Sequence, residues 1–186
     1  MVRETVSRAL PVAAGLFLLL GCAAASAQPK GVPAPPRGAL AALAPEGFTS
    51  SGPPLLFGTS EHPLADGDIF TYIDGGGVVY LEHGFADLVH AEYGDGRGTT
   101  ITLDVYGMAT SEQARQAMAD ERICPPGAGP LDFAPSGKSY RFPPDYFFYF
   151  VQGRRLIYLH VNDDRLSARL AQFGVTVKSV LEKEGP

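Results

Sequence analysis

The chain has few cysteines and no excess of basic residues, and each shortage excludes a class of protein. Its only cysteines are Cys22 and Cys124, too few for the disulfide framework by which many small secreted domains are held together. There are 15 Lys and Arg residues against 20 Asp and Glu residues, a formal charge of −5. This balance disfavours nucleic-acid binding, which requires a basic surface. A packed hydrophobic core must therefore supply the stability.

Long hydrophobic runs are also missing. The apolar stretch 9–20 is interrupted by Pro11 and Gly15, and it is too short for a permanent membrane helix, which needs about 20 residues. Arg3 and Arg8 precede it and small residues follow it. A positive head, a short apolar region and small residues are typical of a signal peptide. We therefore predict export from the cytoplasm.

Two cleavage sites are compatible with this signal. Leu19-Leu20-Gly21-Cys22 resembles the lipobox of bacterial lipoproteins, which predicts a signal at 1–21 and a membrane anchor on acylated Cys22. Ala25-Ser26-Ala27 also fits an ordinary small-x-small site, with a signal at 1–27 and a soluble periplasmic or secreted product. The position of the lipobox at the end of the apolar run favours lipid anchoring.

A Pro/Ala-rich segment follows the signal. We predict a semi-extended tether over 22–46 and a single α+β domain over 47–186, because prolines prevent a regular helix or central strand. The prolines of the tether are Pro29, Pro33, Pro35, Pro36 and Pro45. Residues 47–65 are expected to be loop-like, with several Gly and Pro turn signals.

The first half of the domain predicts a helix and a hairpin. Three-four spacing of apolar residues indicates a helix that begins near Asp66 or Asp68 and continues through Tyr80. Segments 85–93 and 99–106 are typical of two strands around the glycine-rich loop 94–98. Thr110 with Gln113 is a capping-box signature for a helix ending near 122.

The second half of the domain also predicts a hairpin and a helix. Segments 145–151 and 156–161 predict a second hairpin, and a last helix follows Asn162 or Asp163, with a kink or break expected at Gly174. Hairpins require antiparallel pairing. The predicted fold is α+β, with a single antiparallel sheet of about 4–5 strands, helices packed mainly on one face, and the order α-β-β-α-(β)-β-β-α.

One segment resembles the signature of a known family. Its members share aromatic, acidic and glycine positions that match Tyr72, Asp74, Gly75, Gly76, Tyr80, Gly84 and Phe85. On these residues the chain is similar to the DUF6599 family, uncharacterised bacterial proteins often expected to be exported or lipid-anchored. The resemblance implies a fold and a compartment, and it brings no activity, substrate or cofactor. We expect these residues to be structural.

Catalytic and metal-binding motifs are absent from the sequence. There is no G-x-S-x-G elbow, and His83 and His90 lack the spacing of a zinc site. The glycine clusters lack the pattern of a phosphate-binding loop, and Cys124 is expected at the C-terminal end of a helix, which disfavours a thiolate. We predict no catalytic residue, no metal and no cofactor.

The aromatic segment 140–150 is unusual. It contains Tyr140, Phe142, Tyr146, Phe147, Phe148, Tyr149 and Phe150. Both faces of such a strand are apolar, so it is expected to be either a central strand covered on both sides or an exposed contact surface that includes Phe148 and Phe150.

These observations predict an exported accessory or binding module, held at the membrane by a lipid anchor. Its partner is expected to be an envelope protein or a small apolar ligand, and no nucleic acid. The alternative is a hydrolase-like envelope enzyme with a site near Tyr72, Asp74 and His83.

Overall fold

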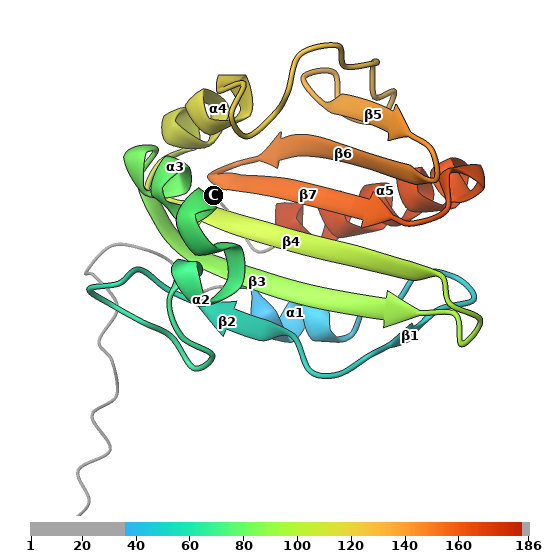
Figure 1. The fold of residues 1–186 in the computed structure, drawn as a ribbon, viewed down its shortest axis with the longest axis horizontal. Helices are drawn as coiled ribbons and strands as arrows, with labels where there is room; N and C mark the ends of the chain where they lie inside the picture. The colour runs from blue at the N-terminus through green and yellow to red at the C-terminus, as the bar shows by residue number, and fades with distance from the viewer. Residues whose placement is uncertain (1–35, 184–186) are drawn as a thin grey trace, which may run out of the picture.

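One antiparallel sheet forms the centre of the fold. The computed structural model describes residues 36–183, and seven strands of this part form the sheet (Figure 1). They are β1 (Thr49–Ser50), β2 (Leu55–Phe57), β3 (Phe85–Gly94), β4 (Thr100–Met108), β5 (Lys138–Phe142), β6 (Asp145–Gln152) and β7 (Arg155–Val161). Their order is β1-β3-β4-β7-β6-β5, and β2 also pairs with β3. The predicted α+β class with a single antiparallel sheet is confirmed.

The predicted number of strands was too low, because β1 and β2 lie in the segment expected to be a loop. Each is two or three residues long, and β2 pairs Leu55 with His90 and Phe57 with Leu88. Strands this short carry no alternating pattern of their own, so only their pairing with β3 identifies them.

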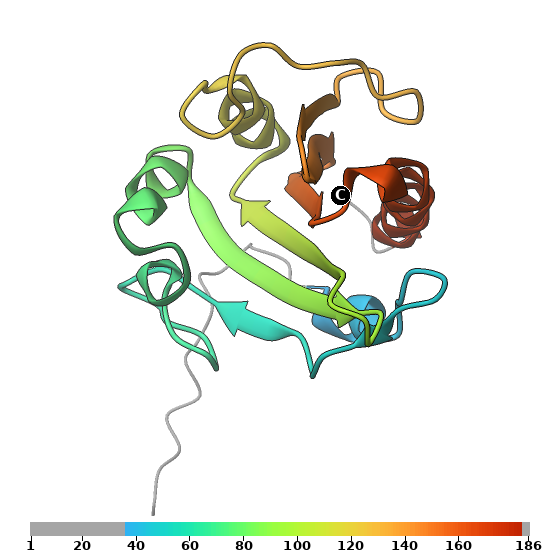
Figure 2. The ribbon, with the colours of Figure 1, turned by 45° about the vertical axis from the view of Figure 1, so that its right-hand side comes forward.

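Helices cover both faces of the sheet. α1 (Arg37–Ala41) and α5 (Ser167–Lys183) lie on one face, with the short helix η2 (Asp164–Leu166) leading into α5. α2 (Ile69–Ile73), α3 (Gly77–Glu82) and α4 (Ser111–Ala119) lie on the other, with the short helix η1 (Asp74–Gly76) between α2 and α3 (Figure 2). The prediction of helices mainly on one face was wrong. The physical reason is that the second face also carries large apolar residues, among them Leu88, Tyr106 and Leu156, which need a cover.

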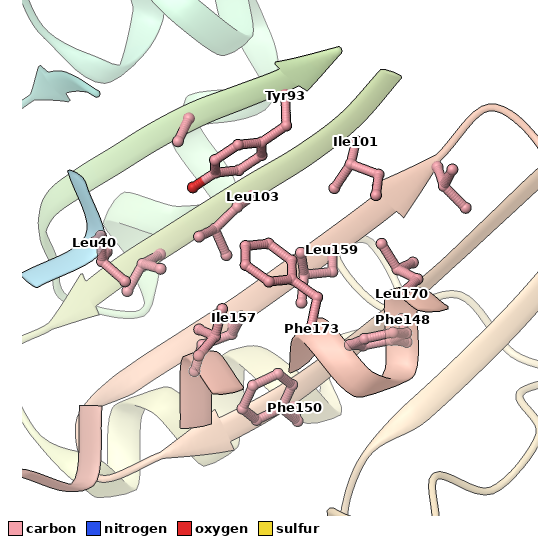
Figure 3. Packing of buried hydrophobic residues seen from close by; sticks show 14 of the residues in the cluster. Leu40, Tyr93, Ile101, Leu103, Phe148, Phe150, Ile157, Leu159, Leu170 and Phe173 are labelled. Carbon is pink, nitrogen blue, oxygen red and sulfur yellow. The ribbon is translucent and has the colours of Figure 1, made fainter. Parts of the chain in front are cut away.

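The core under α5 contains the aromatic residues of β6. Phe148 and Phe150 pack with Leu170 and Phe173 of this helix (Figure 3). α5 runs without a break through Gly174, where a kink was expected. A Cβ at Gly174 would lie 2.7 Å from the Phe133 ring and 2.8 Å from the Phe148 ring. This glycine therefore allows the helix to approach the sheet closely.

The folded domain begins earlier than predicted. α1 lies inside the segment 22–46 that was expected to be a tether, and its Leu40 is 0% exposed against the core under α5. Residues 36–46 therefore belong to the domain, because burial of this leucine fixes the segment to the sheet. The predicted signal peptide and Cys22 lie outside the described residues.

Two predicted helix starts are confirmed. The Asp68 carboxylate accepts hydrogen bonds from the Phe70 and Thr71 amides at the start of α2, and the Thr110 hydroxyl accepts one from the Gln113 amide at the start of α4. Both satisfy amides that have no partner within the helix. α4 ends at Ala119, a few residues before its predicted end.

A buried ion-pair cluster closes one end of the sheet. Asp87 is completely buried and pairs with Arg154 and Arg155, and Arg154 also donates to the backbone carbonyl of Met108. A Cβ at Gly107 would lie 2.5 and 2.6 Å from the two Asp87 carboxylate oxygens. The glycine leaves the space that this carboxylate occupies.

Candidate functional site

A buried carboxylate lies on the face that α2, α3 and α4 partly cover. Asp104 is 2% exposed and accepts hydrogen bonds from three side chains. His90 Nδ1 lies 2.7 Å from its Oδ1, the Tyr72 hydroxyl 3.0 Å from its Oδ2, and the Tyr106 hydroxyl 3.2 Å from its Oδ2. Since the donors come from β3, β4 and α2, this cluster joins all three elements.

His90 is the titratable partner of this carboxylate. Burial alone lowers the pKa of His90, but the hydrogen bond and charge of Asp104, with a contribution from Glu92, outweigh it and raise the pKa above its ordinary value. The Tyr72 ring packs on the imidazole with centroids 4.6 Å apart, and burial and Asp104 also raise the pKa of Tyr72. The contact with Asp104 therefore favours the protonated form of His90.

An aromatic patch lies on the same face along β5, β6 and β7, the strands farthest from α2 in the sheet (Figure 1), and its Tyr149 and Tyr158 also pack against the buried cluster under α3 and α4. We define the aromatic patch as Phe142, Phe147, Tyr149, Tyr158 and His160, all at least partly exposed. Their rings form a continuous series of contacts with centroids 4.9 to 6.5 Å apart. Phe142, at the end of β5, is 59% exposed.

Two tyrosine hydroxyls of the patch have no partner within residues 36–183. Neither Tyr149 nor Tyr158 makes a side-chain hydrogen bond there. No fully buried side-chain oxygen of the described chain is left without a partner, so neither hydroxyl is completely buried. Burial of the rings raises the pKa of both, which keeps the hydroxyls neutral. The patch thus combines apolar rings with free hydrogen-bonding groups.

A pocket of about 220 Å³ lies near the opposite edge of the sheet, beside β2 and β3. Its lining residues are Ser51, Gly52, Pro53, Leu55, His90, Ala91 and Glu92. His90 Nε2 lies 3.9 Å from Glu92 Oε1, so the imidazole that contacts Asp104 with one nitrogen has its other nitrogen near a carboxylate of the pocket.

The residues of the predicted family signature have separate roles. Tyr72 contributes to the Asp104 cluster, whereas Asp74 is exposed and its carboxylate has no partner in the described chain. Asp74 is the one described residue other than glycine with a positive φ, at 55°. Gly75 and Gly76 form η1 with it, and this short turn separates the single predicted helix into α2 and α3.

The other signature residues pack in the fold. Tyr80 stacks on Tyr106 with centroids 4.3 Å apart, and Phe85 is buried in the same cluster. Gly84, with φ of 71°, ends α3, where the left-handed region favours glycine.

His83 does not join Tyr72 and Asp74. Its Nε2 lies 2.8 Å from Asp120 Oδ2, and Arg122 also binds Asp120. Arg122, with a smaller contribution from His83, lowers the pKa of Asp120. The contact fixes the end of α3 to the end of α4, so the structure shows no common site of Tyr72, Asp74 and His83 within residues 36–183.

Phe148 and Phe150 cannot form the predicted contact surface. Both are 0% exposed and point into the core under α5 (Figure 3). Because side chains alternate along a strand, Phe147 and Tyr149 point to the opposite face. The prediction of a contact surface that includes Phe148 and Phe150 was therefore wrong.

The described part of the chain has three further features that bear on function. Cys124 is buried, and this burial raises the pKa of its thiol to about 12. Within residues 36–183, no group of three His, Cys, Asp or Glu side chains is placed to hold a metal ion. No described helix is long and apolar enough to cross a membrane.

The Asp104 cluster was not predicted. The alternation of 99–106 places Asp104 on the side opposite Leu103 and Val105, which is the side expected to face solvent. One signal was present: His90 and Asp104 lie on the two strands of a predicted hairpin, and the loop length determines that they face each other.

Comparison with known proteins gives little further information. No family model and no curated protein matches the chain, so membership of the DUF6599 family stays a prediction. Among solved structures, the chain is similar to the extracellular domain of PknH from Mycobacterium tuberculosis, with a TM-score of 0.44 and 11% identity, covering 73% of this chain and 85% of that one. A likeness of this strength transfers no function.

Proposed function

We propose that the chain is an exported accessory module that binds a partner protein of the cell envelope through the aromatic patch. The observation that carries the proposal is the series of partly exposed rings along β5, β6 and β7, which ends in the exposed Phe142. Aromatic side chains, tyrosine among them, are enriched at protein interfaces because they combine apolar area with a polar tip.

The charge of the patch supports a protein partner. Within residues 36–183, the only carboxylate bonded to the patch is Asp145, whose Oδ1 lies 2.7 Å from His160 Nε2. Phe147 lies beside the His160 ring and packs between Phe142 and Tyr158. A surface of rings with one paired polar group costs little to desolvate, and it leaves the Tyr149 and Tyr158 hydroxyls for specific hydrogen bonds.

Export and lipid anchoring belong to the same proposal. The signal-like head and the Leu-Leu-Gly-Cys sequence support attachment through Cys22. An anchor at the membrane would raise the local concentration of the module near envelope proteins, so that a weak contact surface is sufficient.

A photo-crosslinking experiment tests the proposal. A photoreactive phenylalanine analogue replaces Phe142 in the full-length protein, in cells that naturally make it, and a second variant carries the analogue at Val175, which is 40% exposed on α5 on the opposite face. A discrete crosslinked product is expected from position 142 and absent from 175, and Tyr158→Ser should weaken it. Equal products from both positions, or none from 142, would overturn the proposal.

The hydrolase-like alternative stays a prediction. Its three residues Tyr72, Asp74 and His83 have separate surroundings, so no observation favours it over the binding module.

A further inference from the structure

The pocket beside β2 has chemistry that suits one type of side chain. Pro53 and Leu55 provide apolar walls, and Leu55 is 37% exposed. Glu92 provides a carboxylate whose side chain is 52% exposed. The volume of about 220 Å³ is below the roughly 300–1,000 Å³ of pockets for drug-sized ligands. The pocket therefore fits a single side chain or a similarly small group.

The charge of the lining residues determines which kind of group the pocket can bind. Glu92 is the one carboxylate among the described lining residues, and no lysine or arginine is among them. A carboxylate near apolar walls is complementary to a cation on an aliphatic stem, because the stem covers apolar surface while the charged end makes a charge-assisted hydrogen bond.

We propose that this pocket receives a primary ammonium group on an aliphatic stem, as in a lysine side chain of the bound partner, with the ammonium on Glu92 and the stem against Pro53 and Leu55. This inference rests on the proposed function, and it names a chemical feature of the partner.

The pocket lies on the same face of the sheet as the aromatic patch. Glu92 pairs with Thr102, and Thr102 pairs with His160 of the patch on the next strand. Directly opposite residues point to the same face of a sheet, so the pocket and the patch share one face. Two strand spacings, about 10 Å, separate them. A partner segment lying across the strands therefore reaches both.

His90 makes this site sensitive to pH. The titratable groups that face it are Glu92 from β3, Asp104 from β4 and Tyr72 from α2, and Tyr106 reaches it through Asp104. The segment 51–55 contributes none. A protonated His90 competes with the ligand for Glu92, so binding of the cation strengthens when His90 loses its proton. By linkage, the bound cation must lower the pKa of His90.

The test uses n-butylammonium as the probe, with n-butanol as a neutral probe of nearly the same shape. Amide NMR spectra of the exported chain are recorded during each titration. Butylammonium is expected to cause saturable shifts at Leu55, Ala91 and Glu92 while butanol causes none. Equal effects of the two probes, or no effect of butylammonium, would overturn the inference.

Two matched variants assign the effect to Glu92. Glu92→Gln should weaken butylammonium binding at least about tenfold, as expected for loss of a charge-assisted hydrogen bond. Glu121→Gln removes an exposed carboxylate elsewhere and should leave the affinity unchanged. Both side chains are exposed, so neither variant is expected to unfold the domain. A similar loss in both would show a general charge effect and contradict the site.

The pKa of His90, measured from its imidazole NMR signals, gives an independent test of the coupling. This pKa should decrease in the presence of butylammonium in the wild type, and remain unchanged in Glu92→Gln. An unchanged His90 pKa in the wild type would contradict the coupling. This experiment involves no partner protein and no change in the aromatic patch. Failure of crosslinking at Phe142 and failure of butylammonium binding are therefore separate results.

Discussion

His90 Nδ1 and Asp104 Oδ1 lie 2.7 Å apart on the face that α2, α3 and α4 partly cover, and the pair connects β3 with β4. The Tyr72 hydroxyl donates a hydrogen bond to the same carboxylate, and this bond connects α2 to the pair. The charge state of one imidazole is thereby linked to the packing of a helix on the sheet.

The first prediction concerns the pH dependence of stability. The pKa of His90 is raised in the folded state above its value of 6.5, so its stabilising contribution is complete below about pH 6.5 and is lost as the pH rises through the folded-state pKa. Urea unfolding across this range should show the wild-type free energy of unfolding decreasing more steeply than that of His90→Gln. Parallel curves would contradict the linkage.

The second prediction compares two glycines. Gly107→Ala should destabilise the domain by about 3 kcal/mol, because the added methyl group displaces the Asp87 carboxylate from its arginine partners. Gly75→Ala is the matched control, since a Cβ there has no neighbour within 4 Å, and it should change stability by less than about 0.5 kcal/mol. Chemical denaturation of both variants measures the difference. Comparable values for the two would refute the role of the Asp87 cluster.

The third prediction concerns backbone strain at Asp74. At φ 55° and ψ −137°, an L-residue is strained, whereas glycine adopts this region easily. Asp74→Gly should therefore stabilise the domain by about 1 kcal/mol and raise the Tm by about 4 °C. Asp74→Ala keeps a Cβ and should give no such gain. If Asp74→Gly is less stable than the wild type, the exposed carboxylate contributes a contact that outweighs the strain.

The fourth prediction concerns the N-terminus of the mature protein. Mass spectrometry of the protein from the membrane fraction should find a diacylglyceryl-modified Cys22 as the first residue, and Cys22→Ser should move the protein to the soluble fraction. A mature chain that begins at Gln28 would instead show ordinary cleavage and a freely diffusing domain.

Local signals in the sequence predicted the central part of the fold. The loops 94–98 and 152–155 lie between segments typical of strands, and each produces a hairpin of long strands. Asp68 and Thr110 cap the helices that their positions indicated. These features depend on residues close together in the chain, so they can be derived without knowledge of the tertiary structure.

Other features depend on contacts between distant segments. β2 exists because Leu55 to Phe57 meet β3, and α1 is ordered because Leu40 reaches the core under α5. Asp104 alternates like a solvent-facing residue, yet α2 lies over it and Tyr72 binds it. The candidate site thus depends on a second covered face, which the alternation of 99–106 alone does not reveal.

Alternate residues of β6 point to opposite faces of the sheet and have different roles. Phe148 and Phe150 stabilise the core, while Phe147 and Tyr149 face the proposed partner. Substitutions at positions 147 and 149 can therefore change what the surface recognises while the core under α5 stays intact. If the proposed partner binds there, its recognition can diverge at position 147 without a change in the core under α5, as long as the register of β6 with β7 is kept.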